Sequence, residues 1–552
     1  MSTSTTIFTA RRVHTMNPAQ PTAEAVSVSD GRIAAVGPLA ELRARGGTVD
    51  DRFADTVLLP GFVEGHAHIL TGGIWQHTYV GFYDRLAPDG RLWKGLKSFA
   101  EVVARLQDVE RTLSPPTRPL MAWGFDPIFF GTDQTSTGRM STGQLDQVST
   151  TRPVLVMHQS FHALNVNSAV LDMAGIDGAV PDDAVPTGAD GRPTGELREF
   201  AIMTIAMRAA RADFMDVANS EQGVWDYGRI ANLTGATTVA DLVNRSPEET
   251  GPTYRRITDD PRFPARLFTA MAAWPGDPAA LSGQLRRAMA LNTPKLRFGA
   301  VKFVIDGTLQ GFTARLRPPG FHNGAPNGIW NLTPDQFRRQ VDAFHREGFQ
   351  LHIHTNGDEA TELAIEVLDG VLAQSPRPDH RHTLQHCQLA DEDQFRRMKA
   401  LGLCANIFSN HVHYYGDIHY AQTVGPERAL RMNAAATALR VGLPISIHSD
   451  APVTPFAPLF TASIAVNRLT ARGRVLGEAE RLSVPEALRA VTLGAAYTLG
   501  MDREVGSIEP GKQADFAVLG EDPLEVAPAD LKDVRVLGTV LSGTPFPAAG
   551  QS

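Results

Sequence analysis

Apolar and polar positions alternate along both ends of the chain. Residues 5 to 37 carry this pattern in "TIFTARRVHTM" and "AVSVSDGRIAAVG", which predicts short β-strands with a turn at Asp30 and Gly31. Near the C-terminus, "GSIEPGKQADFAVL" and "VRVLGTVLSGTPF" alternate in the same way and are divided by Pro-Gly and Ser-Gly turns. We therefore expect residues 1–58 and 505–552 to form one small β domain, which the chain leaves and later re-enters.

Strand-like runs alternate with helical ones between these ends. One hydrophobic run, Thr56 to Leu59, leads toward residue 66, and seven more follow at residues 235–243, 265–274, 297–307, 349–358, 382–390, 403–409 and 444–450. Eight βα units predict an α/β fold with a (β/α)8 barrel over residues 59–504, whose chemistry lies at the C-terminal ends of the strands. The stretch from about residue 72 to 226 is too long for one crossover, and its Pro, Gly and Asp content predicts an inserted lobe after the first strand.

The composition narrows the classes of partner and compartment. The chain has 552 residues, 43% hydrophobic and 20% charged, which is enough to bury a large core. Its net charge is -8 and no block of Lys and Arg occurs, so we expect a small-molecule substrate rather than nucleic acid or an anionic membrane. The N-terminal segment lacks the apolar stretch of a signal peptide, and no run of 18 apolar residues occurs. Only two cysteines, Cys387 and Cys404, are present, which favours a reducing cytoplasm.

Residues that commonly bind metals fall on the strand-like runs, mostly at their ends. They are, in chain order, His66, His68, Lys302, His354, His386 and Asp450. The spacing is 32 residues from His354 to His386 and 64 from His386 to Asp450, close to one and then two βα units of roughly 30 residues each. The chain therefore returns to the same edge of the barrel at each of these residues. Since side chains alternate along a strand, His66 and His68 are both expected to point inward and to hold one metal together.

This set of residues suits a borderline divalent ion such as Zn²⁺, because imidazole nitrogen and carboxylate oxygen bind it without any thiolate. Lys302 affects the number of ligands and therefore the number of metal ions that the site can bind. A buried lysine has a lowered pKa and is a neutral nucleophile, so addition of CO₂ would give a carbamate with two oxygen ligands able to bridge two metals. If Lys302 stays unmodified, the histidine pair, one further histidine and Asp450 would bind a single ion. The number of ions, one or two, is left open.

Nine stretches make the sequence resemble the amidohydrolase superfamily, and within it the YtcJ-like branch that includes N-substituted formamide deformylases. They run nearly end to end: "LPGFVEGHAHI", "FHALNVNSAVL", "GRPTGELRE", "GATTVAD", "VKFVIDGTLQG", "LHIHTNGDEA", "HSDAPVTPFAPL", "AVNRLT" and "GSIEPGKQADFAVL". The resemblance implies a metal-dependent hydrolase with a composite β-sandwich beside the barrel, and related enzymes suggest a homodimer. It also implies metal ligands at the six positions given above, and the carbamate on Lys302 rests mainly on it.

Four residues beside the predicted ligands are interpreted as their surroundings. Glu64 stands where the family commonly has Asp ahead of the histidine pair, and Gln385 stands where Glu often precedes the sixth-strand histidine. Both changes leave the ligands intact but alter the charge around them. His352 and His448 each lie two residues before a predicted ligand, one layer deeper in the barrel, and are interpreted as packed or hydrogen-bonded core residues.

Four further residues are assigned a functional role, and for most of them a purely structural role is the alternative. Asp306 follows Lys302 by four residues on the same strand face; we assign it to substrate binding, and the alternative is an ion pair with Lys302. His411, after the seventh strand, is expected to face the substrate as a catalytic residue. His162 and Trp75, both in the inserted lobe, are assigned to substrate binding, with plain packing as the alternative.

The expected reaction is hydrolysis of a C–N bond in an amide or N-substituted formamide. Zinc lowers the pKa of bound water to about 7, so hydroxide would attack the carbonyl carbon while the metal stabilises the tetrahedral oxyanion. Asp450 would take the water proton and pass it to the departing nitrogen. The same site would also serve hydrolysis of a C–C, C–O or ring bond, or deamination, and the sequence does not separate these reactions. A silent barrel that acts as a binding protein is the alternative from another class, and it would hold no stoichiometric metal.

Overall fold

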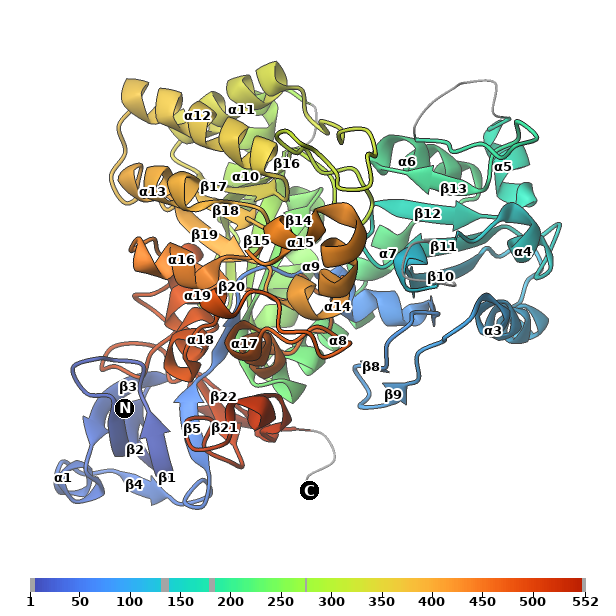
Figure 1. The fold of residues 1–552 in the computed structure, drawn as a ribbon. Coiled ribbons are helices and arrows are strands. Elements are labelled where there is room, and N and C mark those ends of the chain that lie inside the picture. Colours follow the sequence, from blue (N-terminus) through green and yellow to red (C-terminus); the bar gives the residue numbers. More distant parts are fainter. Residues whose placement is uncertain (1–4, 131–138, 178–183, 274–275, 549–552) are drawn as a thin grey trace.

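The structure is a computed structural model that describes residues 5–130, 139–177, 184–273 and 276–548. It has three parts: a β-sheet built from both ends of the chain, a barrel, and a lobe (Figure 1). Trp274, the last residue of the run predicted at 265–274, lies outside the described residues, as do the outermost residues of the predicted β domain and part of the Pro- and Asp-rich stretch of the lobe.

Strands from both ends of the chain join one sheet, as the alternation at the two ends predicts. Their hydrogen-bonded order is β23-β22-β21-β5-β1-β2-β3, and β4 also pairs with β1. The strands are β1 (Thr6–His14), β2 (Thr22–Ser29), β3 (Arg32–Gly37), β4 (Thr48–Asp50), β5 (Val57–Pro60), β21 (Phe516–Leu519), β22 (Val536–Leu541) and β23 (Thr544–Pro547). Phe8 and Phe516 meet in the core of this sheet with ring centroids 6.4 Å apart, so the two ends share one hydrophobic cluster.

The hydrophobic run that leads toward residue 66 serves the terminal sheet. β5 pairs with β1 and β21, whereas the first barrel strand is β6 (Phe62–Glu64), which pairs with β14. Gly61 separates the two strands, and a Cβ there would lie 2.0 Å from Thr237 Oγ1. The first barrel strand therefore lies later and is shorter than the run Thr56–Leu59, because the chain changes sheets at Pro60 and Gly61.

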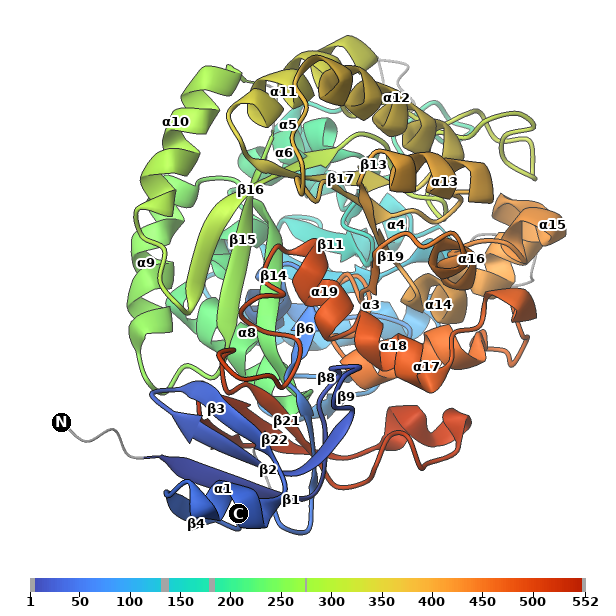
Figure 2. The same ribbon diagram turned by 90° about the vertical axis from the view of Figure 1, so that its left-hand side faces the viewer.

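Eight parallel strands curl in the order β6-β14-β15-β16-β17-β18-β19-β20, which confirms the α/β barrel class (Figure 2). After β6 they are β14 (Ala236–Asn244), β15 (Arg266–Ala272), β16 (Leu296–Val304), β17 (Gln350–Thr355), β18 (Thr383–His386), β19 (Cys404–Ile407) and β20 (Ile445–Ile447). The segments after β6 and β20 bridge the two edge strands: His68 N–H donates to Ala451 O (2.8 Å), and Asp450 N–H donates to His66 O (3.1 Å). This closure brings the first and eighth strand ends side by side.

Helices cover the outside of the barrel between successive strands. They are α8 (Glu221–Leu233), α9 (Pro247–Asp259), α10 (Pro278–Met289), α11 (Pro334–Arg346), α12 (Asp358–Gln374), α13 (Glu392–Ala400), α16 (Ala435–Arg440), α17 (Pro458–Asn467) and α18 (Val484–Ala490). α11 shows how the sequence specifies them. Thr333 caps its N-terminus by accepting from Gln336 N–H, and Phe337 and Phe344, seven residues apart on one face, both pack on Phe303 of β16.

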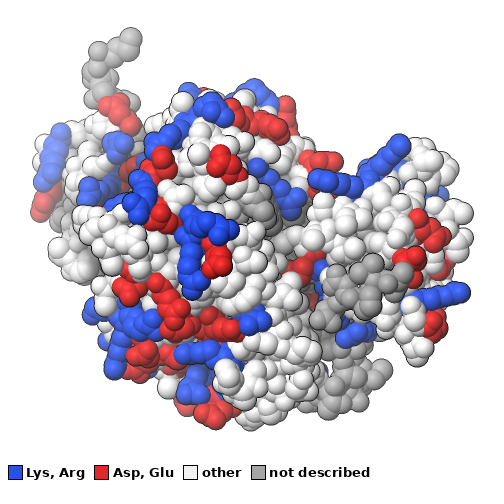
Figure 3. All heavy atoms as spheres, turned by 90° about the horizontal axis from the view of Figure 1, so that it is seen from above, with Lys and Arg blue, Asp and Glu red and all other residues white. Residues whose placement is uncertain are grey.

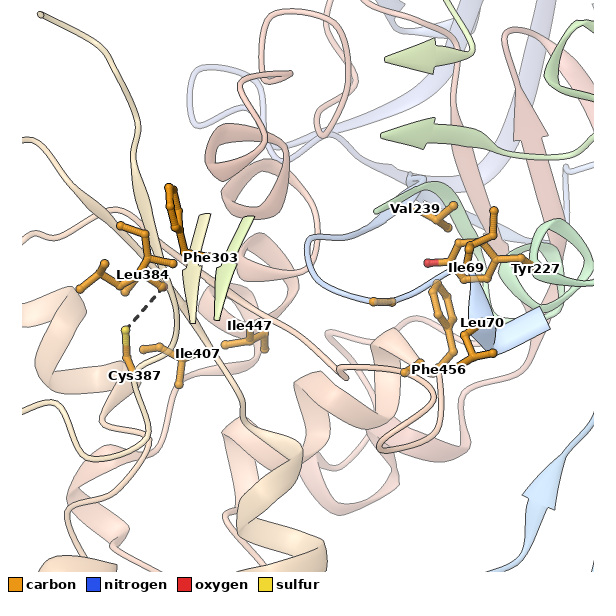
Figure 4. Packing of buried hydrophobic residues seen from close by; sticks show 14 of the residues in the cluster. Ile69, Leu70, Tyr227, Val239, Phe303, Leu384, Cys387, Ile407, Ile447 and Phe456 are labelled. Carbon is orange, nitrogen blue, oxygen red and sulfur yellow. Dashed lines mark hydrogen bonds between the residues drawn. The ribbon is translucent and has the colours of Figure 1, made fainter. Parts of the chain in front are cut away.

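The barrel is packed on both faces of its strands. Figure 4 shows outward residues of β16, β18, β19 and β20 in one group, Phe303, Leu384, Ile407 and Ile447, and a second group around Tyr227 and Phe456. Inside, the end opposite the candidate ligands is filled by α19 (Leu493–Thr498). Its Ala495 and Ala496 cluster with Val63 of β6, Ala240 of β14 and Phe268 of β15. The barrel is therefore solid at one end, and the other end is available for a site.

The lobe between β6 and α8 has its own five-stranded sheet, ordered β13-β12-β11-β10-β7. These strands are β7 (Thr78–Tyr79), β10 (Leu120–Phe125), β11 (Val154–His158), β12 (Ala163–Val166) and β13 (Glu196–Arg198). The helices of this region are α2 (Leu70–Gly73), α3 (Phe99–Thr112), α4 (Thr142–Asp146), α5 (Ser168–Ala174), α6 (Phe200–Ala209) and α7 (Phe214–Ala218). Figure 1 shows the lobe sheet beside the barrel rather than inside it.

Charged side chains of both signs are interspersed on the face seen in Figure 3. Among the described helices, none is long and apolar enough to cross a membrane.

Candidate metal centre

His66 and His68 lie in the segment that follows β6, at the open end of the barrel. The His66 ring is buried, and its Nδ1 lies 2.6 Å from Gln385 Oε1. Because an amide oxygen only accepts, Nδ1 carries the proton and Nε2 keeps a lone pair. This Nε2 lies 3.3 Å from Asp450 Oδ1 and 3.3 Å from Lys302 Nζ. Gln385 thus leaves an unprotonated imidazole nitrogen facing a carboxylate and an amine.

Asp450 lies opposite the two histidines, just after β20. Its Oδ1 is 3.1 Å from His68 Nε2, and its Oδ2 is 3.7 Å from His386 Nδ1. Asp450 and His386 have left-handed backbone conformations, with φ of 54° and 73°, a strain that is common at functional sites. Burial alone would raise the pKa of Asp450, but the hydrogen bond from His68 and nearby positive charges hold that pKa below its usual value. The carboxyl group is therefore ionised at neutral pH.

The residues of this cluster fit a metal ion. One ligand atom from each of His66, His68 and Asp450 lies within 4.8 Å of the others, and the same holds for His66, His386 and His448. Among the described residues, His386 Nδ1 and both ring nitrogens of His448 are buried without a hydrogen-bond partner, which is costly unless another group binds them. Imidazole and carboxylate donors without thiolates are the set that zinc and similar divalent ions accept.

His448 is fully buried and packed, as its interpretation as a core residue predicts. Its ring stacks on that of His66, with centroids 4.6 Å apart and planes at 16°, and lies 5.0 Å from the ring of His386. Burial lowers the pKa of His448 to about 3, so the ring is neutral. His352, interpreted in the same way, does have a partner, because its Nδ1 accepts from Gln385 Nε2 (2.8 Å). His352 is thus a hydrogen-bonded core residue and His448 a packed one, although the ring of His448 also lies in a group that could hold a metal, with His66 and His386.

Lys302 projects from β16 into the barrel beside His66. Burial lowers the pKa of Lys302 to about 7, although the charge of Asp450 acts in the opposite direction. Its Nζ lies next to the imidazole rather than pairing with Asp306, whose carboxylate is engaged elsewhere. A neutral amine is therefore available at neutral pH, and carbamate formation requires one.

Asp306 is held by backbone groups of neighbouring loops. Its carboxylate accepts from the N–H groups of Asn356 (3.1 Å), Gly357 (2.9 Å) and Arg315 (3.2 Å). Its Oδ1 also lies 3.4 Å from His354 Nε2. The structure does not place this fully buried side chain on the cavity wall, where substrate binding was expected. Asp306 instead positions the loop that follows His354.

A cavity opens over the cluster. All six predicted metal ligands line it: His66, His68, Lys302, His354, His386 and Asp450. The facing wall is apolar and comes from α6 and α7 of the lobe, through Phe200, Met203, Met207, Phe214 and Met215. The cavity thus combines a polar floor with an apolar compartment, as small-molecule sites commonly do.

The remaining predicted residues lie in two different places. His162 and His411 line the same cavity. His162 Nδ1 is 2.9 Å from Glu199 Oε2, and His411 Nδ1 is 3.0 Å from His419 Nε2, so each imidazole is oriented by a buried partner. Trp75 lines a separate cavity, and the structure does not bring it to the candidate metal centre as the assignment to substrate binding expected.

The residues of the apolar wall were not predicted from the sequence. Met203 and Met207 lie four residues apart on α6, and Phe214 and Met215 begin α7. Such a stripe is more often helix core, so by itself it does not indicate a cavity. Arg245 also lines the cavity, and its place just after β14 was a usable signal, because barrel sites are built at the C-terminal ends of strands.

The fold and this cluster define a barrel protein with a candidate metal centre at the C-terminal ends of its strands. The model of the amidohydrolase family matches residues 54–546, and the chain belongs to that family. A second match, over residues 25–45, is to the imidazolonepropionase-like composite domain of bacteria.

Individual proteins of known sequence or structure agree with this assignment. The chain is 27% identical to N-substituted formamide deformylase of Arthrobacter pascens, with 96% of each chain covered. It is also 27% identical to YtcJ of Bacillus subtilis, over 96% of this chain and 97% of that protein. The crystal structure of an uncharacterised metal-dependent hydrolase from Pyrococcus horikoshii is similar with a TM-score of 0.71 at 19% identity, covering 95% and 99% of the two chains. The structural likeness concerns the fold, and the sequence matches confirm the resemblance to the YtcJ-like branch.

Proposed function

We propose that the protein hydrolyses a C–N bond in an amide or N-substituted formamide, with a divalent metal such as zinc at the cavity floor. The observation that carries the proposal is the position of Asp450, whose Oδ1 lies 3.1 Å from His68 Nε2 and 3.3 Å from His66 Nε2 beneath the cavity. The similarity to a formamide deformylase over nearly the whole chain supports the choice of bond. The apolar wall from α6 and α7 supports a substrate with an apolar substituent.

His66, His68 and Asp450 would hold the metal, with His386 adjacent. When bound, a divalent ion polarises a carbonyl group and lowers the pKa of water toward neutrality. Asp450 is ionised because its pKa is lowered, so it takes a proton from the attacking water and delivers it to the departing nitrogen. Gln385 keeps the Nδ1 proton of His66 in place, and the apolar wall limits the access of bulk water.

Lys302 is proposed to carry the carbamate. The neutral amine attacks the carbon of CO₂, a new N–C bond forms, and one proton leaves the nitrogen, so that a negatively charged two-oxygen group replaces the amine. The lowered pKa of Lys302 and its distance of 3.3 Å from His66 Nε2 support this step. With the carbamate the site would bind two metal ions, and without it the site would bind one.

The variant Asp450→Asn tests the proton transfer. Turnover of formamide substrates is expected to fall by at least about 10²- to 10⁴-fold, because the base is lost. Metal content, measured by atomic emission on the purified protein, is expected to fall much less than turnover, because His66, His68 and the amide oxygen of the variant still offer ligand atoms. Unchanged turnover would remove Asp450 as the proton carrier, and loss of the metal would make it primarily a ligand.

The variant Lys302→Ala tests the carbamate. Both metal content and turnover are expected to fall, and short carboxylic acids such as formate or acetate should partly restore both by supplying the missing oxygens. The mass of the intact wild-type protein, measured under native conditions in CO₂-containing buffer, gives a readout without activity. A variant with normal metal content and normal rate would overturn the carbamate.

Deamination is the second candidate reaction, because the cluster of His66, His68 and Asp450 alone suffices for a single ion. A screen of the zinc-loaded protein separates the two. Formamides and acyl amides should release an amine together with a carboxylic acid, whereas a deaminase would release ammonia from aminated heterocycles. Turnover confined to the second set would overturn the proposed amide hydrolysis.

A further inference from the structure

A second, smaller cavity adjoins the one over the metal cluster. It lies between the lobe sheet and the loop after β16, and the two cavities share the side chains of Ser160, His162, Thr308 and Gln310. The character of the two spaces differs. The first has the apolar wall described above, whereas the second is lined by Asp126, Arg139, His158, Glu196, Arg198 and Glu199. A molecule that reaches past His162 would therefore pass from an apolar into a polar environment.

Two acceptors on the wall of the second cavity lack donors. Glu199 Oε1 and Gln310 Oε1 are buried and have no hydrogen-bond partner among the described residues, and their side chains belong to residues only 6% and 7% exposed. The other carboxylate oxygen of Glu199 is engaged with His162 Nδ1 at 2.9 Å. Buried acceptors without donors are costly, so an occupant of this space gains most if it brings N–H groups.

The charges around the cavity favour a cationic occupant. Arg198 is already paired, since its Nε donates to Glu196 Oε1 at 2.7 Å, and Arg139 is exposed at the rim. Asp126 is buried and uses one oxygen to accept from Ile128 N–H (3.2 Å). Among the described residues, His162 is the one charged partner of Glu199, and Asp126 has no arginine or lysine partner. Burial raises the pKa of Asp126 to about 7, and a cation beside it would favour its ionised form. A primary ammonium has three donors and one positive charge, which suits two carboxylates and one amide oxygen.

We propose that the second cavity binds a primary ammonium group of the substrate, placed beyond the scissile carbonyl and held by Glu199 and Gln310. The apolar chain between the two functional groups lies in the first cavity, and His162 stands at the passage between them. The identity of the scissile bond rests on the proposed function above, whereas ammonium binding does not. The expected substrates are thus N-acylated or N-formylated diamines rather than simple alkyl amides.

Matched substrates test this proposal on the zinc-loaded protein. Mono-N-formyl diamines with three to six carbons are compared with N-formyl alkylamines of equal chain length. The wild type is expected to show kcat/KM about 10- to 100-fold higher for the best ammonium substrate than for its alkyl match, as a charged hydrogen-bond donor warrants. Glu199→Gln and Gln310→Met should each reduce this ratio by about 10-fold. Met203→Leu, in the apolar wall, should leave the ratio unchanged.

Calorimetric titration with the free diamines, such as 1,5-diaminopentane, gives a readout without turnover. Binding that weakens in Glu199→Gln supports the site even if no formamide is hydrolysed, and in that case only the proposed reaction fails. If formamides are hydrolysed with no preference for the ammonium series, or with a preference that both variants retain, the ammonium site is overturned and the reaction stands. Absence of diamine binding in the wild type also overturns it and means that water fills the cavity.

Discussion

At the scale of single residues, Gln385 links two histidines through one amide. Its Oε1 accepts from His66 Nδ1 (2.6 Å) and from Asn406 Nδ2 (3.0 Å), and its Nε2 donates to His352 Nδ1 (2.8 Å). A carboxylate, which is common at this position in the family, would still accept from His66 but would face the lone pair of His352. The amide therefore fixes the tautomers of both rings at once.

Gln385→Leu is expected to weaken zinc affinity by about 10- to 100-fold. The variant removes the acceptor that orients the His66 ring and keeps the proton on its Nδ1. Titration of metal-free protein with zinc in the presence of a competing chelator measures the change. Gln385→Glu is the matched control, since it keeps an acceptor for His66 and should stay much closer to the wild type. Equal zinc affinity in the wild type and the leucine variant would show that this hydrogen bond does not position the ligand.

The spacing of the strand-like runs was sufficient to predict that six residues line one cavity, since strand ends in a barrel share one edge. Their role as metal ligands stays a prediction. The spacing was not sufficient for the partners of those residues. Asp306 follows β16, as expected, but its carboxylate accepts hydrogen bonds from three backbone N–H groups of distant loops. His448 is packed as predicted, but alternation gives the face of a strand and not the distance to a neighbouring ring, so the stacking on His66 at 4.6 Å was not predicted.

At the scale of elements, the packing of α2 on α8 fixes the segment that carries the histidine pair. α2 begins two residues after His68. A Cβ added at Gly72 would lie 2.1 Å from Gly223 O and 2.4 Å from Tyr227 N, so the two helices approach backbone to backbone. Only glycine at residue 72 permits this approach without displacement of one helix.

Gly72→Ala is expected to lower the free energy of unfolding by about 1–3 kcal/mol, because the added methyl group overlaps backbone atoms of α8 that cannot rotate away. Zinc affinity should fall as well, since α2 follows His68 directly. Gly370→Ala in α12 is the control, as nothing lies within 4 Å of its Cβ, and it should raise stability by about 0.5–1 kcal/mol. Urea denaturation of both variants measures the effects; a stable Gly72→Ala protein with normal zinc affinity would contradict the constraint.

Element boundaries were harder to predict than element types. The run predicted at 382–390 becomes β18, which ends at His386, because residues 386 and 387 have φ of 73° and 47° and turn the chain out of the sheet. Nothing in the hydrophobic pattern of "HTLQHCQLA" marks that turn. The change of sheet between β5 and β6 was hidden in the same way, since both strands are largely apolar and only Gly61 separates them.

At the scale of the whole molecule, the number and spacing of strands predicted the barrel, and the alternation of apolar and polar positions predicted the pairing of the two chain ends. The cavity wall required the structure. Met203 and Phe214 lie far along the chain from Lys302 and His386, and only the placement of the lobe over the barrel brings them to one cavity. The amphipathic pattern of a helix shows that one face is buried, but it does not show whether that face meets core or substrate.

A buried ion pair ties the terminal sheet to the barrel. Arg266 begins β15, Asp515 precedes β21, and their side chains meet at 2.8 Å while only 1% and 3% exposed. Each partner has further hydrogen bonds: Arg266 Nε donates to Pro294 O (2.7 Å), and Asp515 Oδ1 accepts from Ser542 N–H (2.8 Å). The pair therefore joins the C-terminal part of the terminal sheet to β15, the strand that lies two positions from β6 in the barrel.

Removal of one partner is expected to cost more than removal of both. Asp515→Asn leaves the Arg266 charge buried without a counter-ion, so the free energy of unfolding should fall by about 3–5 kcal/mol. The double variant Arg266→Met with Asp515→Asn removes that charge, and its loss should be clearly smaller than the sum of the two single losses. Urea denaturation of the four proteins forms a double-mutant cycle that measures the coupling.

Neither residue lines the cavity over the metal cluster, so folded protein of every variant should keep its zinc affinity. Additive losses would show that the pair is not coupled and that the sheet is held to the barrel by its apolar contacts alone.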